Sequence, residues 1–376
     1  MDKKILFISH WYPTEKNQIS GKFIKNHAEA ISLVAQINVI HFDIQYSPKY
    51  LDIKLLKIVD NNIETYKIQM HSKFYKLFYY SINFQYFLFK RLIKKFNIDL
   101  STFNLVHSNV LFPAGLIGHK ISKRSKIKQV HTEHWSKISR FLEKDILRKS
   151  GKKALANMSA ISSVSENFNN SLKKYYPEKR IFIVPNIIDN KTFNVQNTAR
   201  KSENVAFLSV ANWQEPKHPF YFLDALEKVF LSKTFDFKLT IAGEGKLLEK
   251  VRNGLYSFPI NFVGSVDSNQ LNTLLNSSNF LLHASKFETF SVIIVESLMA
   301  GTPVLVSDVG IASEVINSSN GAICKDNLED WFTQINDSLT KKYDYQEISN
   351  SIKNNYSREE ISQKFNLLYE FALSEL

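Results

Sequence analysis

The sequence is poor in the residues that mark disulfide-bonded, metal-bound and membrane-spanning proteins. Its 376 residues include a single cysteine, Cys324, which excludes an intrachain disulfide and leaves no cysteine set for a structural zinc ion. No apolar run approaches the length that crosses a bilayer, and the four apolar residues 5–8 are too few for a secretion signal. We therefore expect a cytoplasmic protein.

Patterns for metal binding are missing as well. The chain has no Asp-x-Asp motif and no group of histidines at the spacing of metal ligands. The sequence therefore predicts chemistry that needs neither a bound metal ion nor another cofactor.

Acidic residues are scarce in the first half of the chain. Residues 1–200 contain 33 Lys and Arg against 14 Asp and Glu, whereas residues 201–376 contain 15 against 22. A basic half beside an acidic half suggests that the first half faces an anionic partner, such as a membrane, a nucleic acid or a phosphorylated acceptor.

Residues 65–98 contain no acidic side chain at all, and residues 73–96 within them are rich in aromatic residues and lysines. On a helix, the aromatic side chains of this segment would point in nearly every direction. Two interpretations stay open. The segment is a buried helix whose basic end reaches solvent, or it is an interfacial element that binds anionic lipid or a lipid-linked acceptor.

At this length two domains are the default. Short β-rich runs alternate with helical stretches, which predicts two α/β domains with parallel sheets. The predicted strands of the first domain are 4–9, 37–42, 104–107, 127–131, 160–165 and 181–184, and those of the second are 205–210, 238–242, 260–263, 280–284, 303–307 and 321–324.

A polar stretch at 194–204 reads as the linker between the two series. We predict a first domain over 1–195 and a second over 203–357. The final helical segment, 358–376, is expected to pack back on the first domain.

Residues 283–306, HASKFETFSVIIVESLMAGTPVLV, carry the clearest functional pattern. Glu288 lies in the loop after a strand, and Glu296 lies eight positions later, within a helix that ends at Gly301. In an open α/β sheet such a junction binds ligands, because free N–H groups and the positive end of the helix dipole face the crevice. The amides near residues 290–292 could bind a diphosphate, and the two carboxylates could accept hydrogen bonds from hydroxyls.

This segment resembles the signature of the retaining GT4 glycosyltransferases, and further pieces match over nearly the whole chain in the family's order. The resemblance implies the GT-B fold, with two Rossmann-like domains facing each other across a deep cleft. It also implies that Glu288 contacts the donor sugar and Glu296 the nucleotide ribose. Phe290, Ser291 and Val292 would lie at the diphosphate.

Two further segments extend the implied donor site. SVANWQEPKH at 209–218 places Lys217 where the family has a phosphate-binding lysine, whereas Asn212 replaces the usual arginine and adds no charge. IAGEGKLLEKV at 241–251 resembles the family's Gly-x-Gly turn, which assigns Gly243 and Glu244 to the donor site. A lone surface lysine and an ordinary turn are the plain alternatives.

In the first domain the resemblance implies an acceptor or phosphate loop with Gly21 at the entrance of the first helix, and His107 after a strand. His134 would approach the transferred sugar. His131 competes with it for that role, and Asn109 replaces a histidine that often follows His107. The alternative is that Gly21 relaxes a turn and that the histidines are structural.

The sequence thus predicts a metal-independent, retaining hexosyltransferase with His134, Lys217 and Glu288 in catalytic roles. The donor would be a UDP- or GDP-sugar and the acceptor a glycan or lipid-linked glycan, in surface polysaccharide biosynthesis. Peripheral association with the inner face of the membrane through residues 73–96 is part of the prediction, and nucleic acid is not an expected partner. The alternatives are a GT-B epimerase or phosphorylase, or a non-enzymatic membrane- or nucleic-acid-binding protein, against which the retained Lys217, Glu288 and Glu296 argue.

Overall fold

The structure, a computed structural model, describes residues 3–15, 17, 20–176, 178–196, 205–233 and 235–374. The chain divides into two compact units, residues 1–187 with 358–376, and residues 188–357. Of the predicted linker at 194–204, the part from 197 onward lies outside the described residues, as do positions 375 and 376 of the predicted last helix.

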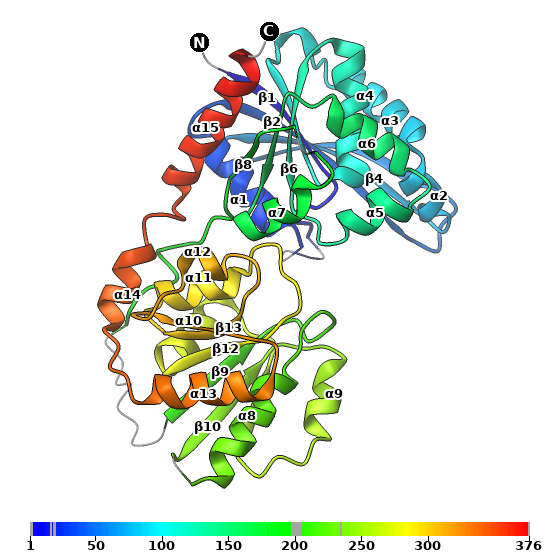
Figure 1. The fold of residues 1–376 in the computed structure, drawn as a ribbon. Helices are drawn as coiled ribbons and strands as arrows, with labels where there is room; N and C mark the ends of the chain where they lie inside the picture. Colours follow the sequence, from blue (N-terminus) through cyan, green and yellow to red (C-terminus); the bar gives the residue numbers. More distant parts are fainter. Residues whose placement is uncertain are drawn as a thin grey trace. The chain divides into compact units, whose positions relative to one another are not determined.

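The first unit is built on an eight-stranded sheet in the order β3-β4-β2-β1-β5-β6-β7-β8 (Figure 1). All neighbouring strands are parallel except β3, which runs antiparallel to β4. The strands are β1 Lys4–Ser9, β2 Gln36–Tyr46, β3 Asp52–Asp60, β4 Ile63–Ser72, β5 Leu105–Asn109, β6 Lys128–Glu133, β7 Ala160–Ser163 and β8 Ile181–Ile183. The six strands predicted for this half are confirmed, and the β3-β4 hairpin is an addition.

The helices of the first unit cover both faces of this sheet. They are α1 Lys22–Ile31, α2 Tyr75–Tyr80, α3 Ile82–Lys95, α4 Leu116–Ser125, α5 Ile138–Lys144, α6 Arg148–Ala156, α7 Glu166–Lys173 and α15 Arg358–Ser374, with short turns η1 Leu100–Thr102 and η2 Leu111–Gly115. The C-terminal helix α15 lies beside α1 (Figure 1) and adds Phe365, Leu368 and Tyr369 to the core.

The period of two along β1 explains how this sheet separates two cores. Ile5 and Phe7 point to the core under α1 and α15, whereas Leu6 and Ile8 point to the core under α3 and α4. Strands that are buried on both faces read as continuous apolar runs, as in the sequence ILFI.

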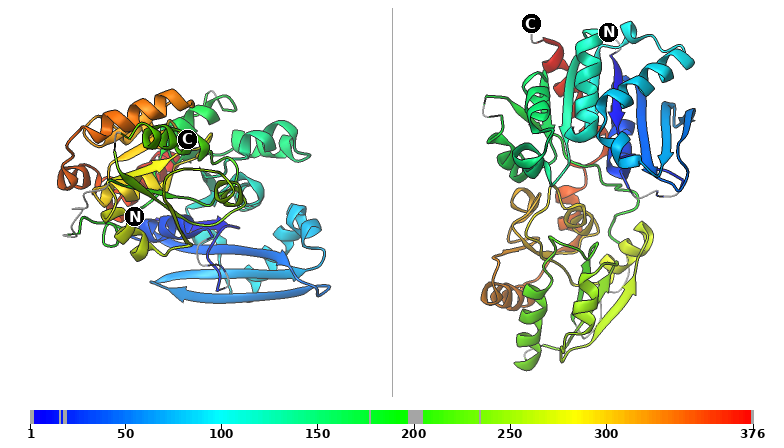
Figure 2. Two further views of the ribbon diagram at one scale, coloured as in Figure 1. Left: turned by 90° about the horizontal axis from the view of Figure 1, so that it is seen from below. Right: turned by 90° about the vertical axis from the view of Figure 1, so that its right-hand side faces the viewer.

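The β3-β4 hairpin lies at the edge of the sheet, where its long strands stand out in both views of Figure 2. Its two-residue turn, Asn61-Asn62, has both residues at positive φ, 49° and 63°, which is the backbone of a tight hairpin. Beyond the hairpin, residues 73–96 form two helices separated at Ser81. Helix α2 buries no residue, whereas α3 buries one stripe of Gln85, Leu88, Phe89 and Leu92.

The second unit has a six-stranded parallel sheet in the order β11-β10-β9-β12-β13-β14. Its strands, all predicted, are β9 Val205–Val210, β10 Phe237–Ala242, β11 Ile260–Gly264, β12 Phe280–His283, β13 Val304–Ser307 and β14 Gly321–Cys324. The helices are α8 Phe220–Leu231, α9 Leu247–Arg252, α10 Ser268–Asn276, α11 Val292–Met299, α12 Ala312–Val315, α13 Leu328–Leu339 and α14 Tyr345–Ile352.

This strand order is that of a Rossmann sheet, 3-2-1-4-5-6, which reverses direction between its first and fourth strands. Here the reversal lies between β9 and β12. The first unit repeats the pattern around β1 and β5 and adds strands at both edges. The predicted α/β class, with two units built on parallel sheets, is confirmed.

Candidate functional site

The loops after β9 and β12 meet at the point where the second sheet reverses its strand order. The backbone N–H of His218 donates to the carbonyl of Ala284 at 3.0 Å, and that of Lys286 donates to Pro216 at 3.0 Å. Lys217 and Ser285 form an isolated bridge between these hydrogen bonds. Two loops that are about seventy residues apart in the sequence are therefore fixed against each other at the usual ligand position of this fold.

Four polar side chains converge at this junction. The ammonium of Lys217 forms an ion pair with Oε1 of Glu288. Nε2 of His283 lies 3.4 Å from Nζ of Lys217, 3.5 Å from Oε1 of Glu288 and 3.2 Å from Oγ of Ser291. The predicted residues Lys217, Glu288 and Ser291 are thus brought together, and His283 lies at their centre.

Charge and burial oppose each other at Glu288. Burial alone would raise its pKa, but the hydrogen bond with His283 and the charge of Lys217 outweigh burial and hold the pKa at about 2. The pKa of His283 is lowered, chiefly by burial and then by the charge of Lys217. At neutral pH the junction therefore holds an ionised carboxylate, an ammonium and a neutral imidazole.

Helix α11 begins at this cluster and presents its positive end. Ser291 precedes the helix in the left-handed region, at φ 70°, and its hydroxyl bonds to His283 instead of capping the helix. The first turn contains no acidic residue. Because the first N–H groups of a helix have no partner within it, an anion can bind here.

The loop after β13 packs closely against the residues that precede α11. A Cβ atom at Gly310, which has φ +59°, would collide with the carbonyl of Phe290, so glycine is required for this approach. The N–H of Ile311 donates to the same carbonyl at 2.8 Å, and Phe290 itself is buried. Glu296 is the fifth residue of α11 and is half-buried, roughly one turn into the helix from Val292.

The glycine-containing turn after β10 is held against the loop after β9. Cβ atoms at Gly243 or Gly245 would collide with the backbone of Ala211 or Trp213, respectively. Trp213 donates its backbone N–H to the carbonyl of Glu244 at 2.8 Å. The side chains of Asn212 and Glu244 are exposed at the surface of these two turns. The glycines are therefore needed to join the two turns, whatever ligand lies beside them.

In the first unit, Gly21 and the residues after β5 belong to the loops that leave the sheet at its own reversal point. Gly21 precedes α1 in the left-handed region, at φ 73°, and a Cβ atom there would overlap the backbone of Trp11 and Tyr12. This close contact within the protein explains why position 21 is a glycine. Contact with an acceptor or phosphate stays a prediction.

His107 is enclosed in β5. Its Nδ1 lies 2.7 Å from the hydroxyl of Tyr369 and its Nε2 lies 2.8 Å from Oγ1 of Thr132. Burial is the first cause of a pKa well below the usual value. Both ring nitrogens of His107 are therefore hydrogen-bonded within the protein, so neither is free for the predicted contact with an acceptor.

His134 is buried like His107, but it differs in that both of its ring nitrogens lack a hydrogen-bond partner among the described residues. Burial, followed by the neighbouring His27, lowers its pKa well below the usual value. The carboxylate of Glu133 accepts the backbone N–H groups of His134 and Trp135 at 2.9 and 2.8 Å and that of Leu111 at 3.0 Å. The loop that carries His134 is thus fixed by a buried carboxylate.

Two other buried side chains near the first unit's reversal point have unpaired polar atoms. Asn109, at the end of β5, leaves both Oδ1 and Nδ2 without a partner. His27 of α1 donates from Nε2 to the carbonyl of Pro185 at 2.9 Å, so Nδ1 carries a lone pair that no described residue uses. The rings of His27 and His134 are 5.3 Å apart. Buried polar atoms without partners are costly and mark a place where a ligand or water completes the site.

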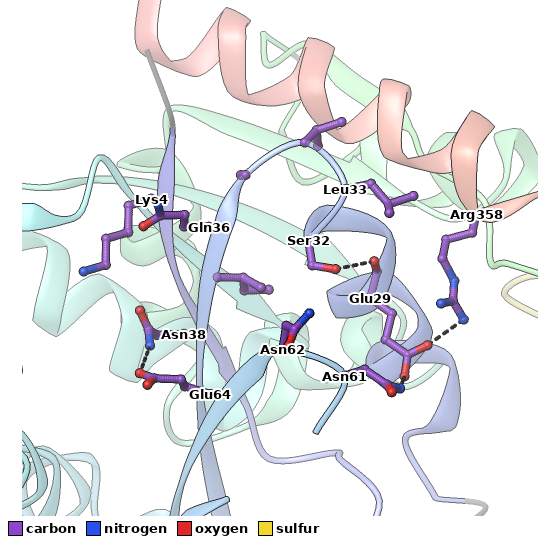
Figure 3. Close-up of a pocket in the computed structure, with 13 residues that line it drawn as sticks. Lys4, Glu29, Ser32, Leu33, Gln36, Asn38, Asn61, Asn62, Glu64 and Arg358 are labelled. Carbon is purple, nitrogen blue, oxygen red and sulfur yellow. Dashed lines mark hydrogen bonds and ion pairs between the residues drawn. The ribbon is translucent and has the colours of Figure 1, made fainter. Parts of the chain in front are cut away.

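A cavity of about 890 Å³ lies elsewhere, at the amino ends of β1, β2 and β4 (Figure 3). Its charged side chains already have partners: Arg358 donates to Glu29 at 2.6 Å, Glu64 accepts from Asn38 at 2.8 Å, and Lys4 donates to Thr102 at 3.0 Å. Ligands of this fold bind at the opposite, carboxyl ends of the strands. We therefore do not assign the functional site to this cavity, despite its size.

The described residues contain no group of three or more His, Cys, Asp and Glu side chains that could hold a metal ion. In the same part of the chain, no helix is long and apolar enough to cross a membrane. Independence from metal ions stays a prediction.

His283 is the residue that the sequence analysis missed. It lies at the end of β12, in the segment that was singled out, but a lone histidine after a strand gives no signal by itself. His283 contacts Lys217, which is far away in the sequence. The strand order brings these two residues together, so the sequence alone could not pair them.

Two family models together cover most of the chain. "Glycosyl transferases group 1" matches residues 190–358, and "Glycosyltransferase Family 4" matches residues 60–191. An uncharacterized glycosyltransferase of Methanocaldococcus jannaschii is 25% identical over 86% of this chain and 84% of its own length.

A GDP-mannose-dependent alpha-(1-6)-phosphatidylinositol dimannoside mannosyltransferase of Mycobacterium tuberculosis is 30% identical over 38% of this chain and 39% of its own length. Among solved structures, Anabaena HepE in complex with UDP-glucose matches with a TM-score of 0.67 and 14% identity, covering 99% of this chain and 100% of that one. The chain belongs to the GT4 family of glycosyltransferases and has the GT-B fold.

Proposed function

We propose that this enzyme transfers a hexose from a UDP- or GDP-sugar to a glycan or lipid-linked glycan, with retention of configuration and without a metal ion. The observation that carries the donor assignment is the cluster of Lys217, His283, Glu288 and Ser291 at the entrance of α11. It combines one ammonium, uncapped helix amides and an ionised carboxylate at the ligand position of a Rossmann sheet. Support for the donor class also comes from the GDP-mannose-dependent relative and from the neighbour solved with UDP-glucose.

In the proposed mechanism, Lys217 and the first turn of α11 stabilise the departing nucleoside diphosphate. Negative charge grows on that group as the glycosidic bond breaks, and fixed donors in a water-poor site stabilise such charge most strongly. An ammonium has three donor hydrogens, so Lys217 can keep its bond to Glu288 and still bind a phosphate oxygen. This interaction is the largest catalytic contribution that we assign to the protein.

Glu288 positions the sugar. Its Oε1 pairs with Lys217. An ionised carboxylate is an acceptor only, so Oε2 suits a sugar hydroxyl that donates. Glu296, one turn into the helix, is proposed to accept from the ribose.

We assign His134, with its unpaired ring nitrogens, to the transferred sugar. His27, on α1, is proposed to support His134. Asn109, at the end of β5, is proposed to form a hydrogen bond with the same sugar. These three buried side chains leave polar atoms unsatisfied that sugar hydroxyls would satisfy.

A thermal-shift panel tests the donor class. UDP, GDP and ADP, and UDP-glucose and GDP-mannose, are added to the purified chain with and without EDTA. Because a ligand that binds only the native state raises the melting temperature, a uridine or guanosine nucleotide should raise it in EDTA. No shift with any nucleotide would refute the donor assignment.

Product analysis separates transfer from the related reactions. Incubated with its donor alone, the proposed enzyme should only hydrolyse it slowly. Efficient conversion of the sugar nucleotide without an acceptor would identify an epimerase instead. Loss of all activity in EDTA, restored by Mg²⁺, would contradict the metal-independent mechanism.

Peripheral membrane association through residues 73–96 also belongs to the proposal. Phe74, Leu77 and Tyr80 are exposed, with Leu77 at 70%, and the exposed Lys76 lies between Phe74 and Leu77. Exposed apolar and basic side chains on one short helix suit an anionic membrane surface. The chain should sediment with vesicles containing phosphatidylglycerol but not with pure phosphatidylcholine, and Leu77→Asp should abolish this, whereas Leu255→Asp, another exposed leucine, should not.

A further inference from the structure

A second cavity of about 320 Å³ lies on the β3-β4 hairpin of the first unit. We call it the hairpin pocket. Its lining comes from β2, β3 and β4, from residues 12–15 of the loop after β1, and from a single residue of α1. Its lining includes Tyr12, His41, Asp43, Lys67, Gln69 and His71.

The floor of this pocket is a sheet face that changes character along β2. Ile37 and Val39 are buried in the core under α1, but the next residues on the same face are His41 and Asp43. These two polar side chains remain only 2% and 5% exposed. Burying these charged and polar side chains, where apolar ones would continue the pattern, costs stability. We therefore read His41 and Asp43 as ligand-binding residues and not as packing residues.

The polar atoms of the floor are arranged in one network. Asp43 accepts from Lys67 at 2.8 Å and from Gln45 at 2.6 Å. Burial alone would raise the pKa of its carboxyl, but the hydrogen bond and charge of Lys67, together with His41 and His71, lower it. The amide of Gln69 donates to Nδ1 of His71 at 3.4 Å. That leaves Nε2 of His71 as a donor, and it is buried, 3.6 Å from Asp43, with no hydrogen-bond partner among the described residues.

The charges of the pocket exclude an anion. Lys67 is paired with Asp43, and Lys25 is paired with Asp60 at 2.6 Å, while Glu15 adds a further carboxylate. Burial lowers the pKa of His41 to about 4, so this imidazole is neutral at pH 7. Among the described lining residues, a phosphate would therefore find no unpaired lysine, whereas a neutral ligand rich in hydroxyls would find both donors and acceptors.

The remaining walls suit the same ligand. Tyr12 offers an aromatic ring on one side, and Leu56 and Ile58 of β3 form a partly exposed apolar rim on the other. The C–H faces of a sugar ring are apolar, and its hydroxyls are polar. A volume of this size lies near the lower end of the range for small-ligand sites, about 300–1,000 Å³, and suits one or two sugar rings.

We propose that the hairpin pocket binds a neutral sugar residue of the acceptor glycan. The inference rests on the proposed function, because the acceptor is a glycan only if the enzyme builds one. The wall formed by residues 12–15 belongs to the loop that leaves β1 at the reversal point of the first sheet, where a Rossmann-like unit binds its ligand. The pocket thus extends the acceptor site along the hairpin.

Saturation-transfer NMR on the full chain tests this proposal. The probes are the methyl glycosides of glucose, galactose, mannose and N-acetylglucosamine, with glucose 6-phosphate as a charged probe. At least one neutral glycoside should give a signal, and His71→Leu and Gln69→Ala should each reduce it at least about fivefold, as expected when a buried hydrogen bond is lost. Lys57→Ala, on the opposite face of the same hairpin, should leave it unchanged.

The outcomes separate this proposal from the donor assignment. Two results together support both proposals. The nucleotide-dependent melting shift is equal in the wild type and in His71→Leu, and the glycoside signal of the wild type is lost in that variant. If the same melting shift is seen, three results overturn the hairpin pocket alone. These are no glycoside signal, a glycoside signal that the two pocket variants do not reduce, or binding of glucose 6-phosphate only. Absence of any nucleotide shift in the wild type instead refutes the donor site, and a glycoside signal that both pocket variants reduce would then still support the pocket.

Discussion

At the scale of single residues, the account depends on the ion pair between Lys217 and Glu288. Lys217→Ala and Glu288→Gln should each lower kcat/KM at least about tenfold, or roughly 1.4 kcal/mol of transition-state stabilisation, because each changes a group that is proposed to bind the donor. Lys228→Ala is the matched control, since Lys228 and Glu329 form an exposed pair at 2.7 Å on α8 and α13. Near-normal rates in both site variants would refute the assignment.

His134 and His107 should respond in opposite ways. His134→Leu should lower turnover while leaving the melting temperature equal or higher, because it removes two buried nitrogens that have no partner. His107→Leu should lower the free energy of unfolding by about 1–3 kcal/mol, because it leaves Tyr369 and Thr132 without a partner. Denaturant titration and steady-state rates measure both. Equal loss of stability in the two variants would show that His134 is also structural.

The grouping of the candidate site residues was predictable from the sequence only where a local pattern marked them. Glu288, Ser291 and Lys217 stand in recognisable segments, and the structure brings them together. His283 and His27 could not be assigned, because their importance comes from neighbours that are distant in the sequence and from unpaired atoms that only coordinates reveal.

At the scale of elements, the turns around the donor site depend on glycine. Gly243→Ala should destabilise the second unit and abolish the nucleotide-induced melting shift, because its Cβ would collide with Ala211. Gly264→Ala is the matched control: it also has positive φ, +70°, but a Cβ there meets nothing within 4 Å. Its cost should be limited to the backbone strain, about 1 kcal/mol. Equal behaviour of the two variants would contradict the role of the close contact.

The elements themselves were largely predictable, and the exception is informative. Each of the twelve predicted strands is present, since parallel strands buried on both faces leave strong apolar runs. The β3-β4 hairpin was missed because β3 is an edge strand with most side chains exposed, so no buried run marks it. Asn61-Asn62, between two β-rich runs, is the local sequence signal that indicates this hairpin.

At the scale of the whole molecule, buried histidines make stability depend on pH. Burial is the main cause that lowers the pKa of His10 to about 3 and those of His27 and His41 to about 4. These side chains stay neutral in the native state but take up protons in the unfolded state below about pH 6.5. The free energy of unfolding should therefore fall as the pH decreases from 6.5 toward 4, by up to about 2 kcal/mol for each histidine at pH 5.

Melting curves between pH 7.5 and 5 measure this dependence, and His10→Gln should reduce its slope by removing one of the titrating groups. A melting temperature that is the same at both ends of the range would contradict the burial of these imidazoles. Glu288 acts in a lower window: its pKa of about 2 means that its charge is lost only below about pH 4, so it does not limit activity near neutrality.

The most direct test of the central claim is a crystal structure of the enzyme with UDP or GDP, whichever gives the larger melting shift. The account predicts diphosphate oxygens within hydrogen-bond reach of the Lys217 ammonium and of the backbone amides at the start of α11, with no metal ion between them. A nucleotide bound elsewhere, or a diphosphate held by a metal ion away from Lys217, would contradict it.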